Sequence, residues 1–135
     1  MSAALENYKA DNGVYPSDTA TEALNARSSG DPTSYQTASL FLYEALSGDS
    51  DANRAADQKS YLAFKPNMLL PLGGTGNVTA ICDPFGKSYG YSTAYQKDAS
   101  TGYNPTFDLW STGGETAQKS GETFQEYQAR WIKNW

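Results

Sequence analysis

The chain has 135 residues, of which 10 are Lys or Arg, 15 are Asp or Glu and none is His, so its formal net charge is -5. Because the Lys and Arg residues are scattered, this acidic chain is poorly suited to nucleic acid or to an anionic membrane face. The lack of His excludes Ser-His and Cys-His pairs, an imidazole general base and a His-ligated zinc ion. The composition therefore favours a single non-catalytic domain over residues 1–135, with no nucleic-acid partner.

The N-terminal segment is predicted to be the end of a helix. Over residues 3–11, Leu5 and Tyr8 belong to one apolar stripe, as an amphipathic helix requires. Gly13 then supplies the left-handed residue that closes a helix, and Pro16 prevents its continuation. A helix this short is not stable alone, so it either packs on the domain or continues a longer upstream helix.

Two interior helices are predicted, over Thr19–Ala26 with Ser17 or Thr19 as its cap, and over Tyr35–Leu46, ended by Gly48. The apolar face of the second is predicted to consist of Ala38, Phe41, Leu42, Ala45 and Leu46. Residues 66–77 are predicted to be irregular, because they contain two Pro and three Gly.

The second half of the chain is predicted to form strands, over Val78–Ile81, Ser88–Thr93 and Thr106–Ser111. Asp83-Pro84-Phe85-Gly86 has the residue preferences of a type I turn. Residues 124–132 are predicted to be helical or extended, with aromatic side chains that cover the sheet. The predicted fold class is therefore α+β: an N-terminal helix packed on a small antiparallel sheet, with a helical or loop insertion between Leu46 and Val78.

The only cysteine, Cys82, follows the apolar residues Val78, Ala80 and Ile81 and has no adjacent cation. We interpret it as a buried small hydrophobe rather than a reactive thiol. No stretch reaches the roughly 18 consecutive apolar residues that a membrane-spanning helix needs.

Three segments and the chain end carry a family resemblance through their order and spacing. The segments are Leu5–Pro16, which contains Asn12-Gly13 and Tyr15-Pro16, then Asp83–Tyr91, then Phe107–Gly113, and the chain ends in Ile132-Lys-Asn-Trp135. Together they resemble the globular part of the type IV pilin and pseudopilin family. Within it they are most similar to the major pseudopilins of type II secretion, the general secretion pathway protein G group.

The resemblance implies a pilin-like fold and a structural role: a subunit of a type II secretion pseudopilus or type IV pilus-like filament, without catalysis. It implies a leader and an apolar helix of about one membrane width upstream of Met1. The partners would be other pilin or pseudopilin subunits, contacted through that helix, and the inner-membrane secretion platform. The protein would sit in a bacterial inner membrane with this domain in the periplasm, and these residues alone would be soluble. A minor pilin of a type IV pilus is the second choice, but its C-terminal disulfide cannot form with Cys82 alone.

The resemblance also implies a calcium site, because secretion pseudopilins bind calcium in the loop that follows their Ser-x-Gly motif. Here Glu115 stands where a family aspartate is expected and Glu122 lies near another, whereas Trp131 replaces the aspartate expected before Ile132. The candidate ligands in this loop are Thr112, Glu115 and Glu122.

A second calcium candidate lies in the insertion, where alternate polar residues match positions 1, 3, 5 and 9 of an EF-hand-like loop. These residues are Asp49, Asp51, Asn53 and Asp57. The pattern departs at Arg54, which replaces Gly, and at Ser60, which replaces the bidentate Glu. The alternative is a solvated acidic loop between two helices. We expect either no cofactor or one calcium ion, and no transition metal.

A secreted glycan- or peptide-binding module is the alternative function. Its binding surface would consist of exposed aromatic residues chosen from Tyr89, Tyr91, Tyr95, Tyr103, Trp110, Trp131 and Trp135. Aromatic residues on a small sheet more often form its core and its cross-strand pairs. Trp110 is expected to be the exception, because Phe107 and Leu109 of the same strand are predicted to point to the other face.

Overall fold

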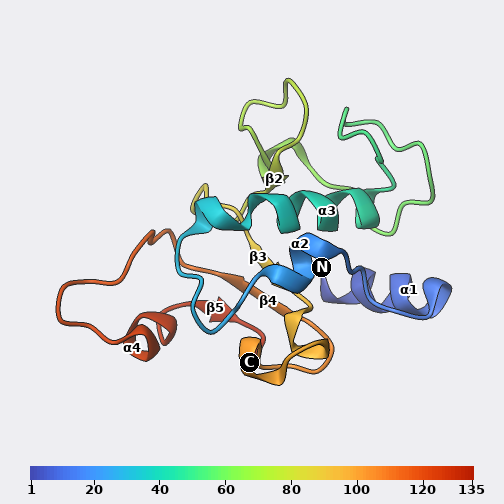
Figure 1. The fold of residues 1–135 in the computed structure, drawn as a ribbon. Coiled ribbons are helices and arrows are strands. Elements are labelled where there is room, and N and C mark those ends of the chain that lie inside the picture. The colour runs from blue at the N-terminus through green and yellow to red at the C-terminus, as the bar shows by residue number, and fades with distance from the viewer.

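A computed structural model describes all of residues 1–135 and has the α+β class predicted from the sequence (Figure 1). Its α-helices are α1 (Ser2–Asn12), α2 (Thr19–Ala23), α3 (Gln36–Ser47) and α4 (Phe124–Gln128). Its strands are β1 (Leu69–Leu70), β2 (Ala80–Ile81), β3 (Gly90–Ser92), β4 (Asp108–Ser111) and β5 (Ile132–Lys133). Short 3₁₀ turns occupy Pro32–Tyr35, Pro66–Met68, Ala94–Gln96 and Ala99–Thr101.

The strands form two antiparallel sheets. In the smaller sheet β1 pairs with β2, so that Leu69 lies opposite Ile81. β1 falls within residues 66–77, which were predicted to be irregular, and it forms because β2 supplies its partner. In the larger sheet β4 lies between β3 and β5, and Trp110 is opposite Gly90 on one side and Lys133 on the other.

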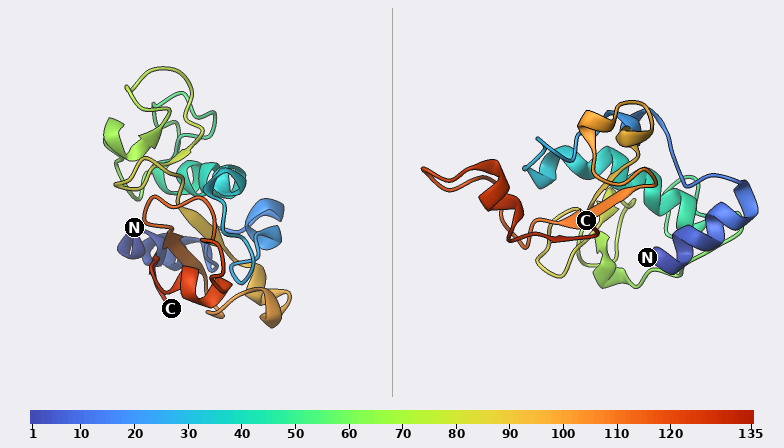
Figure 2. Two further views of the ribbon diagram at one scale, coloured as in Figure 1. Left: turned by 90° about the vertical axis from the view of Figure 1, so that its left-hand side faces the viewer. Right: turned by 90° about the horizontal axis from the view of Figure 1, so that it is seen from below.

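The central helix is α3, which packs against both β2 and β3 (Figure 1). The N-terminal helix was predicted to take that place, but α1 packs beside α3 and buries only Ala4 and Leu5. The difference follows from composition, because α3 offers a longer apolar face that includes the fully buried Leu42 and Leu46. Figures 1 and 2 place α1 and α4 at opposite ends of the molecule.

Local sequence signals set the helix ends. Gly13 (φ 81°) ends α1 and Gly48 (φ 75°) ends α3, both in the left-handed conformation that was predicted. The cap of α2 is Asp18 rather than Ser17 or Thr19, because its carboxylate accepts from the Thr21 N–H at 2.9 Å while the Thr21 hydroxyl accepts from the Asp18 N–H. α2 stops at Ala23 instead of Ala26. On α3, the predicted apolar face is correct for Ala38, Leu42 and Leu46 but wrong for Phe41 and Ala45, which are only half-buried. The buried positions of α3 also include Ser39 and Tyr43.

Two apolar clusters fill the interior. The first surrounds α3 and joins α1, the insertion and the inner face of the larger sheet through residues that include Leu5, Leu42, Leu46, Leu69, Ile81 and Tyr91. The second is rich in aromatic residues and consists of Leu24, Ala26, Tyr35, Ala38, Trp110, Tyr127 and Trp131. The larger sheet is therefore covered on both faces.

The prediction that Trp110 is exposed is wrong, since only 1% of this residue is accessible. Its ring lies 5.1 Å from that of Tyr35 and stacks 6.0 Å from that of Trp131. The same ring lies over Gly90 on the neighbouring strand, where a Cβ would stand 2.2 Å from it. Trp110 thus occupies the centre of the second cluster, and Gly90 leaves the space that it needs.

Candidate functional site

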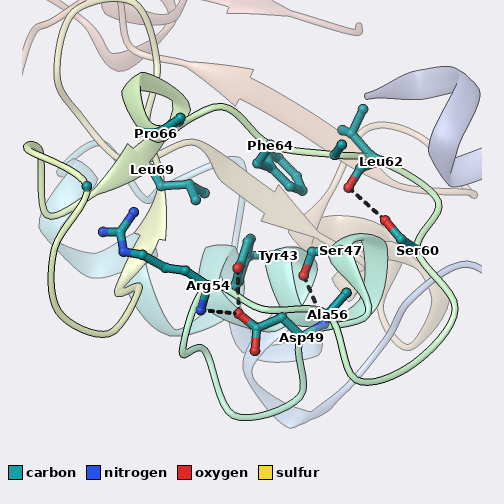
Figure 3. A pocket seen from close by; sticks show the side chains of 12 residues that line it. Tyr43, Ser47, Asp49, Arg54, Ala56, Ser60, Leu62, Phe64, Pro66 and Leu69 are labelled. Atoms are coloured by element: carbon teal, nitrogen blue, oxygen red, sulfur yellow. Dashed lines mark hydrogen bonds between the residues drawn. The ribbon is translucent and has the colours of Figure 1, made fainter.

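A cavity of about 390 Å³ lies between the C-terminal end of α3 and the insertion (Figure 3). Leu62, Phe64 and Leu69 form its apolar wall, while Tyr43 and Asp49 supply polar groups from the end of α3 and the loop after it. The ring of Phe64 packs edge-on against Tyr43 at 5.4 Å. A pocket of this size and mixed lining is within the range that binds small ligands.

The polar centre of this pocket is the Asp49 carboxylate, which is 1% exposed and has no ion-pair partner. Tyr43 donates to it from its hydroxyl at 2.6 Å and the Arg54 backbone N–H donates at 2.8 Å (Figure 3). The backbone N–H of Asn53 also donates to it, at 3.2 Å. Burial raises the pKa of the Asp49 carboxyl, but these hydrogen bonds outweigh burial and hold the pKa below its usual value. Burial and the bond to Asp49 raise the pKa of Tyr43 to about 12.

The Asp49 carboxylate also holds the following loop in an unusual conformation. Ala52 (φ 59°) and Arg54 (φ 76°) both adopt left-handed backbone angles, which cost on the order of 1 kcal/mol for a residue with a Cβ. This conformation carries the Arg54 guanidinium to three backbone carbonyls, those of Gly76 at 2.8 Å, Pro71 at 3.2 Å and Thr75 at 3.5 Å. The charged groups of the pocket are therefore engaged within the protein itself.

The calcium candidates of the Asp49–Asp57 loop are engaged in hydrogen bonds with the protein itself. The N–H group of Asn53 donates to one oxygen of the Asp49 carboxylate, and the Arg54 N–H and the Tyr43 hydroxyl donate to the other. Asp51 and Asp57 are exposed: Asp51 shares the Asn53 N–H with Asp49 and also accepts from the Asn53 side-chain amide, whereas Asp57 accepts from the N–H and hydroxyl of Ser50. Asp49 and Asp51 thus lie close together at the Asn53 N–H, but the acidic residues of the loop do not gather into a group of three.

The loop after β4 brings its two predicted acidic ligands together, but around an arginine. Glu115 and Glu122 both bind the guanidinium of Arg130, which lies between α4 and β5. Thr112, the third candidate, donates from its hydroxyl to the Glu115 carbonyl at 2.6 Å instead of facing the same centre. Nowhere in the chain do three or more His, Cys, Asp or Glu residues form a group that could hold a metal ion. The sequence did not predict a role for Arg130. The only feature that sets this residue apart in the sequence is that it is the sole arginine after Arg54.

The residues that carry the family resemblance contact one another across the fold. Tyr91 donates from its hydroxyl to the Pro16 carbonyl at 2.8 Å, which joins β3 to the segment after α1. The ring of Tyr15 packs edge-on against that of Phe107 at 5.0 Å. The hydrogen bond and the ring contact each link two of the three segments that carry the family resemblance.

The Asp83 turn and the chain end are tied to β4 in the same way. Asp83 accepts from the Ser111 hydroxyl at 2.6 Å and from the N–H groups of Phe85 and Lys87, and the predicted turn is confirmed by the Gly86 N–H bond to the Asp83 carbonyl. Asn134 accepts from the Leu109 N–H at 2.9 Å through its side-chain oxygen. The resemblance residues therefore form one connected structural set.

The aromatic residues considered for ligand binding largely stack on other side chains. One face of the Tyr103 ring is covered by Trp135, stacked at 4.5 Å with 9° between planes, and the Arg27 guanidinium lies 4.3 Å from the ring centre. Like Trp110, Tyr91 and Trp131 are buried, whereas Tyr89, Tyr95, Tyr103 and Trp135 are half-buried. Cys82 is 6% exposed, as predicted, and burial raises the pKa of its thiol.

Comparisons of the chain with protein-family models, curated proteins and solved structures gave no match. No helix in the structure combines the length and apolar character needed to cross a membrane.

Proposed function

We propose that this chain is the globular domain of a structural subunit in a type II secretion pseudopilus or a related pilus-like filament. It assembles with other pilin or pseudopilin subunits through an apolar helix upstream of Met1, and it meets the inner-membrane secretion platform from the periplasmic side. The domain has no catalytic role. The domain contributes a rigid body and an exposed surface to the filament.

One observation carries the proposal: the resemblance residues form a connected structural set. Tyr91 binds Pro16, Asp83 binds Ser111, and Asn134 binds Leu109. A coincidental likeness of scattered short motifs gives no reason for those motifs to meet. The architecture is also compatible, because the chain begins with a helix and contains a three-stranded antiparallel sheet, whereas a strand at its N-terminus would have opposed the proposal.

The alternative, a glycan- or peptide-binding module, has less support. It requires at least two of Trp110, Tyr95, Tyr103 and Trp135 on a concave exposed surface. Trp110 is buried, and Tyr103 is stacked on Trp135 and lies against Arg27. A glycan array probed with the purified domain separates the two functions, because only the binding module gives a signal that Tyr95→Ala or Trp135→Ala removes.

The proposal is tested first by the coding sequence upstream of Met1, where a short basic leader and about 20 apolar residues are expected. The full natural chain is then produced in its own bacterium, and sheared cell-surface material is examined by immunoblotting and electron microscopy. We expect the chain in filaments when it is overproduced, and loss of exported protein when the gene is deleted. An upstream sequence without an apolar segment, together with a monomeric full chain, would overturn the proposal.

A further inference from the structure

We infer that the guanidinium of Arg130 is the resident cation of the loop that joins β4 to α4, and that it takes the place of a bound divalent metal ion there. The metal ion in question is the calcium that the family resemblance implies for this loop, whereas the ion-pair geometry and its test do not require the filament proposal to hold. It rests on the way in which two carboxylates from one loop meet a single positive charge from a residue outside it.

All four carboxylate oxygens of Glu115 and Glu122 accept hydrogen bonds from this one guanidinium. Nε and Nη2 of Arg130 each donate to one oxygen of Glu115 at 2.9 Å. Nη2 also donates to Oε2 of Glu122 at 3.0 Å, and Nη1 donates to Oε1 of the same residue. Paired donation of this kind is the strongest geometry available to arginine and carboxylate, and it uses the planar fork that lysine lacks.

The cluster is partly shielded from water. The Glu122 side chain is 9% exposed, that of Glu115 is 27% exposed and that of Arg130 is 35% exposed. Arg130 also lies 5.6 Å from the ring centre of Tyr127, a fully buried residue of the second apolar cluster. The position of the guanidinium is therefore fixed from the side of the core as well as by the two carboxylates.

The loop is folded so that its acidic side chains face inward to this charge. The Glu122 carboxylate accepts from the Lys119 N–H at 2.8 Å, which closes the turn that precedes it. The Thr112 hydroxyl holds the Glu115 carbonyl at 2.6 Å, so the first part of the loop is fixed from β4. Arg130 then joins both parts to the residues just before β5.

A calcium ion cannot share this place with Arg130. Calcium needs six or more oxygen ligands with concentrated negative charge, and the four carboxylate oxygens here are already engaged. The two carboxylates and the guanidinium sum to one negative charge, so an added divalent ion would make the cluster net positive and would repel Arg130 at close range. The loop is thus ordered without metal.

The test is to remove the guanidinium and ask whether a metal ion then becomes necessary. Thermal unfolding of the wild type is measured with excess calcium and with excess chelator, and calcium affinity is measured by titration calorimetry. We expect the wild-type melting temperature to be the same in both solutions, with no calcium binding. Arg130→Gln leaves two facing carboxylates, so its melting temperature in chelator should fall by roughly 5 °C, and calcium should restore part of that loss.

Three further variants make the result specific. Arg130→Gln combined with Glu115→Gln should lose the calcium rescue, because one carboxylate is gone. Arg130→Lys keeps the charge without the fork, so it should melt between the wild type and Arg130→Gln with a weaker calcium response, and it serves if Arg130→Gln does not fold. Lys119→Gln, in the same loop and exposed, should behave as the wild type.

Two results would overturn the inference. One is a wild-type melting temperature that rises with calcium and loses this rise in Glu115→Gln, which would show a metal ion binding beside Arg130. The other is a destabilised Arg130→Gln or Arg130→Lys protein that calcium does not stabilise, which would show that the carboxylate pair is not a cation site.

Discussion

Ser111 donates a 2.6 Å hydrogen bond from its hydroxyl to the carboxylate of Asp83, and both side chains are buried. The bond joins the turn between β2 and β3 to the end of β4. The other Asp83 oxygen accepts from the N–H groups of Phe85 and Lys87, so one carboxylate orders the turn and fastens it to the larger sheet.

Loss of this bond should destabilise the fold. Ser111→Ala leaves a buried carboxylate oxygen without its donor, which should lower the free energy of unfolding by about 2 kcal/mol in a urea titration. Ser100→Ala is the matched control, because Ser100 donates to Asp98 at 2.7 Å on an exposed surface. The control should cost less than about 0.5 kcal/mol. Equal effects of the two substitutions would contradict the structural role given to Asp83.

The contact between Gly90 and Trp110 predicts a strong steric effect. Gly90→Ala would place a Cβ 2.2 Å from the indole ring of a residue that is 1% exposed and has no room to move. We expect a loss of about 3 kcal/mol in the free energy of unfolding and a changed near-ultraviolet circular dichroism signal from the tryptophan.

Gly121→Ala separates this clash from a backbone effect. Its Cβ would meet nothing within 4 Å, although the φ of 77° disfavours a side chain. It should cost about 1 kcal/mol and leave the tryptophan signal unchanged. A larger loss for Gly121→Ala than for Gly90→Ala would contradict the packing described for Trp110.

These contacts explain which features could be predicted from the sequence. Gly13, Gly48 and the Asp83 turn act within a few residues, so their positions were predicted correctly. The α+β class followed from the order of the helical and strand patterns. The family resemblance and the calcium prediction stay predictions, although the resemblance residues do contact one another.

The features that sequence reasoning missed depend on distant partners. Trp110 and Leu109 are neighbours in one strand and point to opposite faces, so the alternation predicted an exposed Trp110. Its burial depends on Trp131, which reaches it only when the C-terminal segment folds back. The pairing of Arg130 with Glu115 spans 15 residues across a loop and a helix. Similarly, the Arg54 N–H reaches Asp49 from a left-handed backbone, a conformation that an arginine in the sequence does not predict.

The Asp49 carboxylate should be essential for the shape of the pocket. Asp49→Ala would leave the N–H groups of Asn53 and Arg54 and the hydroxyl of Tyr43 without an acceptor, and the left-handed loop would lose its support. We expect a loss of about 3 kcal/mol by urea titration, together with fast hydrogen exchange over residues 50–57. Asp51→Ala, on the exposed part of the same loop, should cost less than about 0.5 kcal/mol. Slow exchange in Asp49→Ala would show that the loop does not depend on this carboxylate.

The Arg130 cluster predicts a specific dependence of stability on pH. Hydrogen bonds from Arg130 lower the pKa of Glu122 to about 2 and also lower the pKa of Glu115, both from 4.5. Because the folded-state pKa values lie below the unfolded ones, the cluster contributes its full stability above pH 4.5 and loses it as the pH falls towards 2. The melting temperature should therefore fall over this interval more steeply in the wild type than in Arg130→Gln, in which neither carboxylate keeps its guanidinium partner. The comparison is a series of thermal melts of both proteins between these pH values at constant salt. Parallel curves would mean that Arg130 does not stabilise the ionised carboxylates, since protonation would then cost both proteins the same stability.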